Sequence, residues 1–240
     1  MMRAALRTEW TKMWTVPGPA WLLAGLVVLT AGLGAATTAV TGCCPADPVK
    51  LSLTGVTLGQ ALVAILAVLA VGGEYSTRMM PVTLAALPVR RFVLAAKAIV
   101  VTTAVLLAGA VAVVASMLAG WLLLPSLGPV LRAGAGSVLY LGLIGLLGIG
   151  TALAVRDSAT AIGVVLGVLY VFPVLATVVG DPRWQRHLMQ VAPMNAGLAI
   201  QSTTHLDRLV IGPWAGLGVL GLWAAGALAV GAAVFTLRDA

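Results

Sequence analysis

Six stretches without a charged residue, each long enough to cross a bilayer, most constrain what this chain can fold into. They cover residues 13–46, 51–73, 98–131, 133–155, 158–180 and 209–237. A membrane-spanning helix needs about 20 apolar residues, and we expect such helices at 20–41, 55–74, 97–124, 136–155, 158–180 and 213–236. Their apolar residues are continuous rather than alternating, which favours helices over a β-barrel. The sequence therefore predicts an all-α integral membrane protein with six transmembrane helices in one domain, residues 1–240.

Composition excludes an ordinary soluble domain, because 61% of the residues are hydrophobic, only 9% are charged, and the mean hydropathy is +1.09. The net charge of +7 is not evidence for nucleic-acid binding, since the basic residues lie in the connections and form no stripe with interleaved aromatics. Basic residues gather in cytoplasmic loops. With the N-terminus inside, nine of the fourteen Lys and Arg are cytoplasmic: Arg3, Arg7, Lys12, Arg78, Arg90, Arg91, Lys97, Arg156 and Arg238. We expect a multi-pass protein of the plasma membrane with both termini in the cytoplasm.

The first nineteen residues are amphipathic and predict a short interfacial helix. A signal peptide is the alternative, but the basic region is long and the apolar run after it can span the bilayer, which favours a retained anchor. We expect Pro17, Gly18 and Pro19 to break this helix before the first crossing. The helical wheel gathers its large apolar residues on one side, beside Arg3 and Arg7: Met2, Leu6, Trp10, Met13 and Trp14.

The connection between the second and third crossings is a polar island. It concentrates five charges in a chain that has few: Glu74, Arg78, Arg90, Arg91 and Lys97. Within it, residues 79–87 are apolar enough for a short helix that is entered near Pro81 and stopped by Pro88. Our hypothesis is that this helix docks a soluble partner on the cytoplasmic side.

Between the fifth and sixth crossings, residues 182–191 and 194–204 are compatible with two short external helices divided by Pro193. They are too short and polar to span, so we interpret them as re-entrant or interfacial. Pro173 is expected to kink the fifth crossing. His187 and His205 lack a carboxylate at ligand spacing, which favours ordinary loop residues over metal ligands.

Small residues recur in two crossings, and they are typical of close helix packing in lipid, with a translocation surface as the sharper alternative. They are Ala61, Ala64, Ala67 and Ala70 in the second and Gly142, Gly145, Gly148 and Gly150 in the fourth. The tight turn at Arg156 and Asp157 is compatible with a solvated turn or with a second partner contact. Adjacent Cys43 and Cys44 have no ligand-like neighbours, and we expect no cofactor.

Motifs for chemistry are absent from the sequence. It has no phosphate-binding Gly-x-x-x-x-Gly-Lys-Ser/Thr loop, no His-Glu-x-x-His and no Gly-x-Ser-x-Gly. The six apolar stretches also lack the ionisable residues that proton relays and ion-coupled carriers use. We expect that the chain is not an enzyme.

The order of these elements resembles the ABC-2 type permease subunits of ATP-binding-cassette transporters, in particular the small permeases of actinobacteria. The resemblance covers the whole architecture and rests on Glu9-Trp10-Thr11-Lys12, Gly73-Glu74-Tyr75-Ser76-Thr77, Thr83-Leu84-Ala85-Ala86, Ala95-Ala96-Lys97 and Pro193-Met194-Asn195-Ala196-Gly197. The sequence departs from the family in having Met80-Pro81 where a longer polar turn is expected.

This resemblance implies an exporter in which two permease subunits form a path for a hydrophobic or amphipathic compound. A separate ATPase subunit hydrolyses ATP and receives a cytoplasmic coupling helix from the connection between crossings two and three. The implied contacts with the ATPase are Glu74, Tyr75, Ser76, Thr77, Arg78, Thr83 and Leu84, with Glu9 and Lys12 beside them. The alternative is a non-transporting membrane scaffold or assembly protein that binds a cytoplasmic partner.

Overall fold

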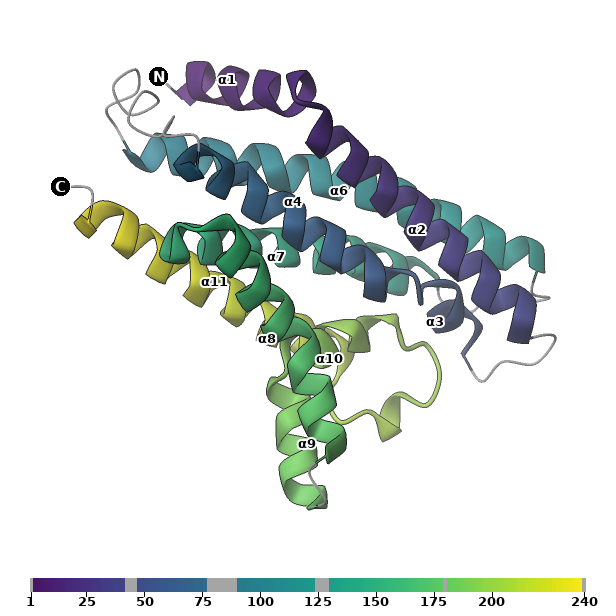
Figure 1. Ribbon diagram of the computed structural model, residues 1–240. Coiled ribbons are helices and arrows are strands. Elements are labelled where there is room, and N and C mark those ends of the chain that lie inside the picture. Colours follow the sequence, from purple (N-terminus) through teal and green to yellow (C-terminus); the bar gives the residue numbers. More distant parts are fainter. Residues whose placement is uncertain (1, 42–46, 77–89, 124–129, 179–180, 239–240) are drawn as a thin grey trace.

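The computed structural model describes residues 2–41, 47–76, 90–123, 130–178 and 181–238. In these ranges the regular elements are all helical (Figure 1). The bounds are α1 Met2–Thr15, α2 Pro17–Thr41, α3 Pro48–Ser52, α4 Val56–Ser76, α6 Arg90–Leu123, α7 Val130–Val155, α8 Ser158–Val178, α9 Pro182–Val191, α10 Pro193–Leu198, the 3₁₀ turns η1 Ala199–Gln201 and η2 Leu206–Arg208, and α11 Pro213–Arg238.

Six of the described helices, α2, α4, α6, α7, α8 and α11, are long and apolar enough to cross a membrane. The prediction of an all-α multi-pass membrane protein is confirmed at that level. The start of α1 and the end of α11 lie at one end of the bundle, whereas α3 lies at the other (Figure 1). We call these the termini end and the opposite end.

Helix α7 forms the centre of the bundle, packed between α4, α6 and α11. Glycine makes this possible, because a Cβ on Gly148 would lie 2.9 Å from that of Ala67, and one on Gly150 would meet the backbone of Ala227 and Leu228. Small residues allow helix backbones to approach this closely. The packing interpretation of the small residues is thus confirmed at these positions.

Helix starts are where the structure corrects the sequence expectations. The predicted interfacial helix, α1, does end before the first crossing, at Thr15, but Pro17 and Pro19 lie in α2, which begins at Pro17. Proline fits a first helical turn, where its missing N–H would have no partner. Helix α6 begins at Arg90 rather than at 97, and α7 at Val130 rather than at 136.

The predicted starts of α6 and α7 lie too far along the chain because the spanning helices were placed in the stretches between charged residues. Lys97 and Arg132 instead lie inside their helices, where other helices supply partners for them. The Arg132 guanidinium donates to the carbonyl of Ser202. A charge inside a spanning helix is tolerated when it is paired.

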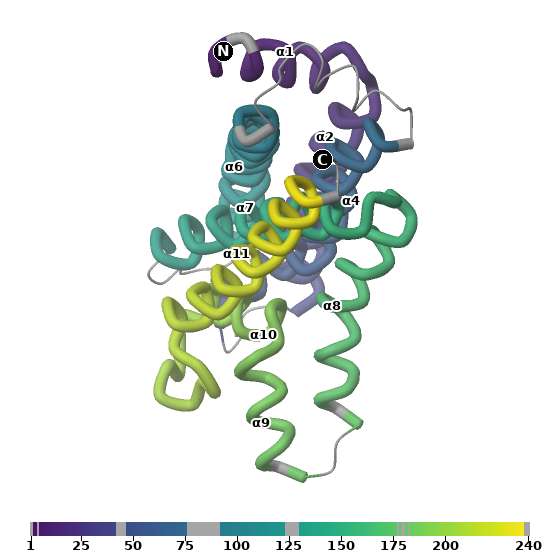
Figure 2. The backbone as a smooth tube through the Cα atoms, turned by 90° about the vertical axis from the view of Figure 1, so that its left-hand side faces the viewer, coloured from purple at the N-terminus to yellow at the C-terminus, as the bar shows by residue number. Residues whose placement is uncertain are grey.

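The segment after α8 returns to the bundle. Helix α9 has the predicted bounds and runs beside α8 (Figure 2), and it also contacts α10 and α11. Pro193 then starts α10, and α10 with η1 buries Ala196 and Ile200 against α11 and α7. Pro173 lies inside α8 as expected. The predicted coupling helix at 79–87 lies outside the described residues.

Candidate functional site

Lys97 is the centre of a charged cluster at the termini end. It lies two turns into α6, and only 2% of its surface is exposed. Its ammonium donates to Glu9 Oε2 at 2.9 Å, lies 2.9 Å from Glu74 Oε1, and donates to the carbonyl of Ala70 at 3.0 Å. An ammonium has three N–H donors, so these contacts occupy all of them.

Three helices that are distant in sequence supply the cluster. Glu9 and Lys12 lie one turn apart on α1, Glu74 lies in the last turn of α4, and Lys97 comes from α6. Lys12 Nζ lies 3.2 Å from Glu9 Oε1 and 2.6 Å from Glu74 Oε1. Each ammonium therefore contacts both carboxylates. We call Glu9, Lys12, Glu74 and Lys97 the four-charge cluster.

Burial makes the four-charge cluster energetically important. Glu9 and Glu74 are 7% and 8% exposed, and two carboxylates with two ammonium groups have no net charge. Buried ions are expensive unless paired, and removing one partner of a buried pair costs about 3–5 kcal/mol. The cluster therefore fixes α1 against α4 and α6. Glu74 Oε2 accepts no hydrogen bond from any described residue.

Lys12 is the more accessible of the two cations, with about a third of its side chain exposed. Its partial burial acts to lower its pKa, but the hydrogen bond and charge of Glu74, together with Glu9, outweigh that effect and raise the pKa. The cluster thus has an inner cation, Lys97, and an outer cation, Lys12.

Tyr75, the neighbour of Glu74, connects the same turn of α4 to other helices. The guanidinium of Arg156 lies 5.8 Å from the centre of the Tyr75 ring, and it donates to the carbonyl of Val234 in α11 at 2.9 Å. Arg156 stands in the turn between α7 and α8 with a left-handed φ of 64°. The last turn of α4 is therefore joined to α1 and α6 by one residue and to the α7–α8 turn by the next.

Arg156 and Asp157 have distinct roles in that turn. Arg156 makes the contacts above, while Asp157 is exposed and caps α8 by accepting from the amide of Thr160 at 2.8 Å and its hydroxyl at 2.6 Å. These hydrogen bonds lower the pKa of Asp157.

Of the residues expected to contact an ATPase, the structure brings together Glu9, Lys12 and Glu74 and places Tyr75 beside them. Ser76 ends α4, and Thr77, Arg78, Thr83 and Leu84 lie outside the described residues. Lys97 was not among the expected site residues. In the sequence, Pro88 could have indicated the position of Lys97, because a helix that starts soon after this proline contains Lys97.

A second polar site, also not expected, lies at the opposite end. Asp47 caps α3 by accepting from the amide of Lys50 at 3.1 Å. It also accepts from the amide of Thr203 at 2.6 Å, the hydroxyl of Thr203 at 2.7 Å and the amide of Thr204 at 3.2 Å. Partial burial acts to raise the pKa of Asp47, but these hydrogen bonds prevail and lower it.

The two histidines are not brought together with other metal-ligating groups. His187 lines a hollow on α9 with Arg183, Arg186 and Gln190, and His205 precedes η2. In the described ranges, His, Cys, Asp and Glu form no group of three that could hold a metal ion. Cys43 and Cys44 are outside those ranges.

No protein-family model matches the chain, and no curated protein matches it.

Proposed function

We propose that this chain is the permease subunit of an ABC-2 type ATP-binding-cassette exporter in the plasma membrane. With a second permease subunit it forms the path for a hydrophobic or amphipathic compound, and a separate ATPase subunit supplies the energy. Six spanning helices with both termini at one end of the bundle are in keeping with this proposal, which places both termini in the cytoplasm.

The observation that carries the proposal is that the last turn of α4 contacts α1, α6 and the turn between α7 and α8. Glu74 contacts Lys12 of α1 and Lys97 of α6, and Tyr75 packs against Arg156. The chain leaves this turn directly into residues 77–89, where the ATPase contact is proposed. A displacement of that segment therefore reaches α1, α6 and the α7–α8 turn through residues already in contact.

The proposed mechanism is mechanical. ATP binding closes the ATPase subunits, the coupling segment moves, and the path between the two permeases changes its access from one side of the membrane to the other. Such a change is a shift between two populated states, and it requires elements that move as units. The four-charge cluster makes such a unit of α1, the end of α4 and the start of α6.

The experiment is a pull-down of the tagged chain in mild detergent, with mass spectrometry and an ATPase assay on the eluate. Arg78→Glu reverses a proposed contact, and Lys50→Glu makes the same reversal on an exposed lysine at the opposite end. We expect an ATPase with a phosphate-binding loop to co-purify with the parent and with Lys50→Glu, but not with Arg78→Glu. If no nucleotide-binding protein elutes with the parent, the proposal fails.

Glu74 requires a different design, because reversing its charge beside Lys97 breaks the four-charge cluster as well as any partner contact. The double variant Glu74→Lys with Lys97→Glu keeps one charge of each sign. We expect it to insert and to restore more ATP-dependent transport than Glu74→Lys alone. Equal transport by the two variants would exclude the cluster from coupling.

A further inference from the structure

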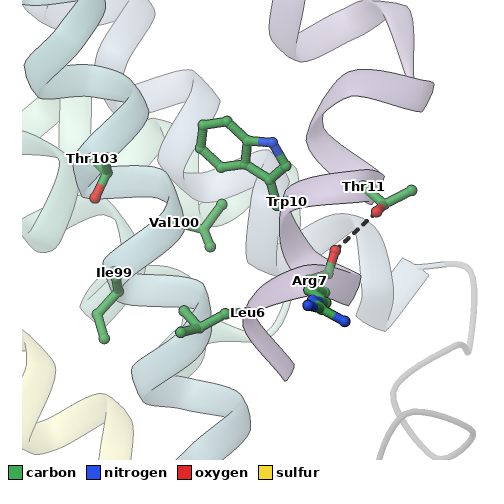
Figure 3. Close-up of a pocket in the computed structure, with 7 residues that line it drawn as sticks. All are labelled: Leu6, Arg7, Trp10, Thr11, Ile99, Val100 and Thr103. Atoms are coloured by element: carbon green, nitrogen blue, oxygen red, sulfur yellow. Dashed lines mark hydrogen bonds between the residues drawn. The ribbon is translucent and has the colours of Figure 1, made fainter. Parts of the chain in front are cut away.

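A hollow of about 440 Å³ lies between α1 and α6 at the termini end. Figure 3 shows Leu6 and Trp10 directed from α1 toward Ile99 and Val100 of α6, with Arg7 at the rim. Arg7 is exposed, as is Arg3 one turn earlier. The hollow is thus mainly apolar inside and has a cation at its mouth.

A second hollow of about 370 Å³ continues along α6, and Trp10 lines both. It is bounded by α1, α2 and α6, and it exists because four of its lining residues are alanines: Ala20, Ala24, Ala104 and Ala108. We call the two hollows together the α1–α6 groove.

The length of the groove matches one leaflet of a bilayer. On α6 it is lined from Ile99 to Val111, twelve residues along the helix. At 1.5 Å per residue this is about 18 Å, and half of the hydrocarbon core of a bilayer is about 15 Å. An acyl chain that lies along the groove therefore reaches about the middle of the membrane.

The rim of the groove has the chemistry of the headgroup region. Trp10 and Trp14 lie with ring centroids 6.0 Å apart and are both exposed. Tryptophan is enriched at the depth of lipid headgroups, and arginine extends its charge to that level along an apolar stem. A phosphate at this depth meets the Arg7 guanidinium, which suits phosphate geometry.

We propose that the α1–α6 groove binds one anionic phospholipid, with its phosphate at Arg7 and an acyl chain along the apolar lining. The four-charge cluster sets the width of the groove, because the ion pair between Glu9 and Lys97 holds α1 at a fixed position relative to α6. This lipid site does not depend on the proposed transport function, since it requires neither an ATPase nor a substrate.

The test is native mass spectrometry of the purified chain, titrated with phosphatidylglycerol or phosphatidylcholine that have identical acyl chains. We expect one tightly held phosphatidylglycerol. Arg7→Gln should reduce its preference over phosphatidylcholine about fivefold, the contribution of one basic residue near an anionic membrane surface. Lys50→Gln, which removes an exposed charge at the opposite end, should leave that preference unchanged.

Filling the groove tests the acyl-chain part of the proposal. Ala24→Phe should weaken the binding of both lipids. Ala36→Phe should not, because Ala36 is also exposed on α2 but lies about 18 Å farther along the helix. An unchanged unfolding temperature shows that each variant is folded. Equal effects of Arg7→Gln and Lys50→Gln, or of the two phenylalanine variants, would overturn the site. So would a chain dimer that displaces the lipid, because a second copy would then occupy the groove.

Discussion

The two ends of the bundle are held together by different chemistry. At the termini end, three ion pairs join α1, α4 and α6 and a fourth lies within α1, and the participating carboxylates and Lys97 are nearly inaccessible. At the opposite end, Asp47 accepts hydrogen bonds from Lys50, Thr203 and Thr204, and Arg132 donates to a carbonyl. The first end depends on balanced charges, whereas the second depends mainly on backbone groups.

This difference has a mechanical consequence. Ion pairs between long side chains persist while helices tilt, because Lys and Glu reorient about several bonds. Hydrogen bonds from consecutive backbone amides to one short carboxylate allow much less movement. We therefore infer that the four-charge cluster keeps α1, α4 and α6 together as one unit when the termini end is displaced, whereas the segments joined at Asp47 stay in place.

Loss of the inner cation should give the largest effect. Lys97→Met leaves Glu9 and Glu74 buried with only Lys12 to balance them, and we expect the free energy of unfolding to fall by about 3–5 kcal/mol. Unfolding of the purified chain in detergent measures this. Lys50→Met, at an exposed lysine of the opposite end, should change stability by no more than about 0.5 kcal/mol.

A double variant separates lost packing from unbalanced charge. Lys97→Met with Glu74→Met removes one charge of each sign and should be more stable than Lys97→Met alone, because buried pairs are often replaced by apolar groups at little cost. If the double variant is no more stable, unbalanced charge is not what destabilises Lys97→Met.

Removal of Asp47 should give the next effect. Asp47→Ala loses the cap of α3 and the connection to Thr203 and Thr204, and a lost cap typically costs about 0.5–2 kcal/mol. Hydrogen exchange should become faster at the amides of Lys50, Thr203 and Thr204. Asp157→Ala removes an exposed cap of α8 and should have the smaller effect. The reverse order would contradict the role given to Asp47.

The four-charge cluster and the Asp47 site also show how much of the structure the sequence could predict. The six spanning helices follow from apolar length alone. The starts of α6 and α7 could not be predicted in this way. Lys97 and Arg132 bound the apolar stretches in the sequence, but they lie inside helices because other helices supply partners for them. Glu9, Lys12 and Glu74 were expected at one site, but that Lys97 joins them depends on tertiary packing. Asp47 gave no signal, because Thr203 is 156 residues away.

Acid should weaken the opposite end. The pKa of Asp47 is lower in the folded chain than its unfolded value of about 3.9, so its stabilising contribution is present above that value and disappears as pH falls through the folded pKa. The stability difference between the parent and Asp47→Asn should therefore shrink on acidification. Unfolding measured from neutral pH to about pH 2 tests this. A difference that stays constant would show that Asp47 does not titrate with folding.

The smallest expected effect is a difference between the two cations of the four-charge cluster, Lys12 and Lys97. The raised pKa of Lys12 means that its stabilising contribution is complete below its unfolded value of about 10.4 and is lost as pH rises through the folded pKa. Because Lys12 is partly exposed, salt should also screen its pairs, whereas the buried pairs of Lys97 should be little affected. We therefore expect the stability difference between Lys12→Met and the parent to be smaller at high salt than at low salt, and the difference between Lys97→Met and the parent to stay the same. Unfolding at the two salt concentrations measures both differences. Equal salt dependence of the two variants would mean that water reaches both cations, and the cluster would then be a surface network rather than a buried joint between α1, α4 and α6.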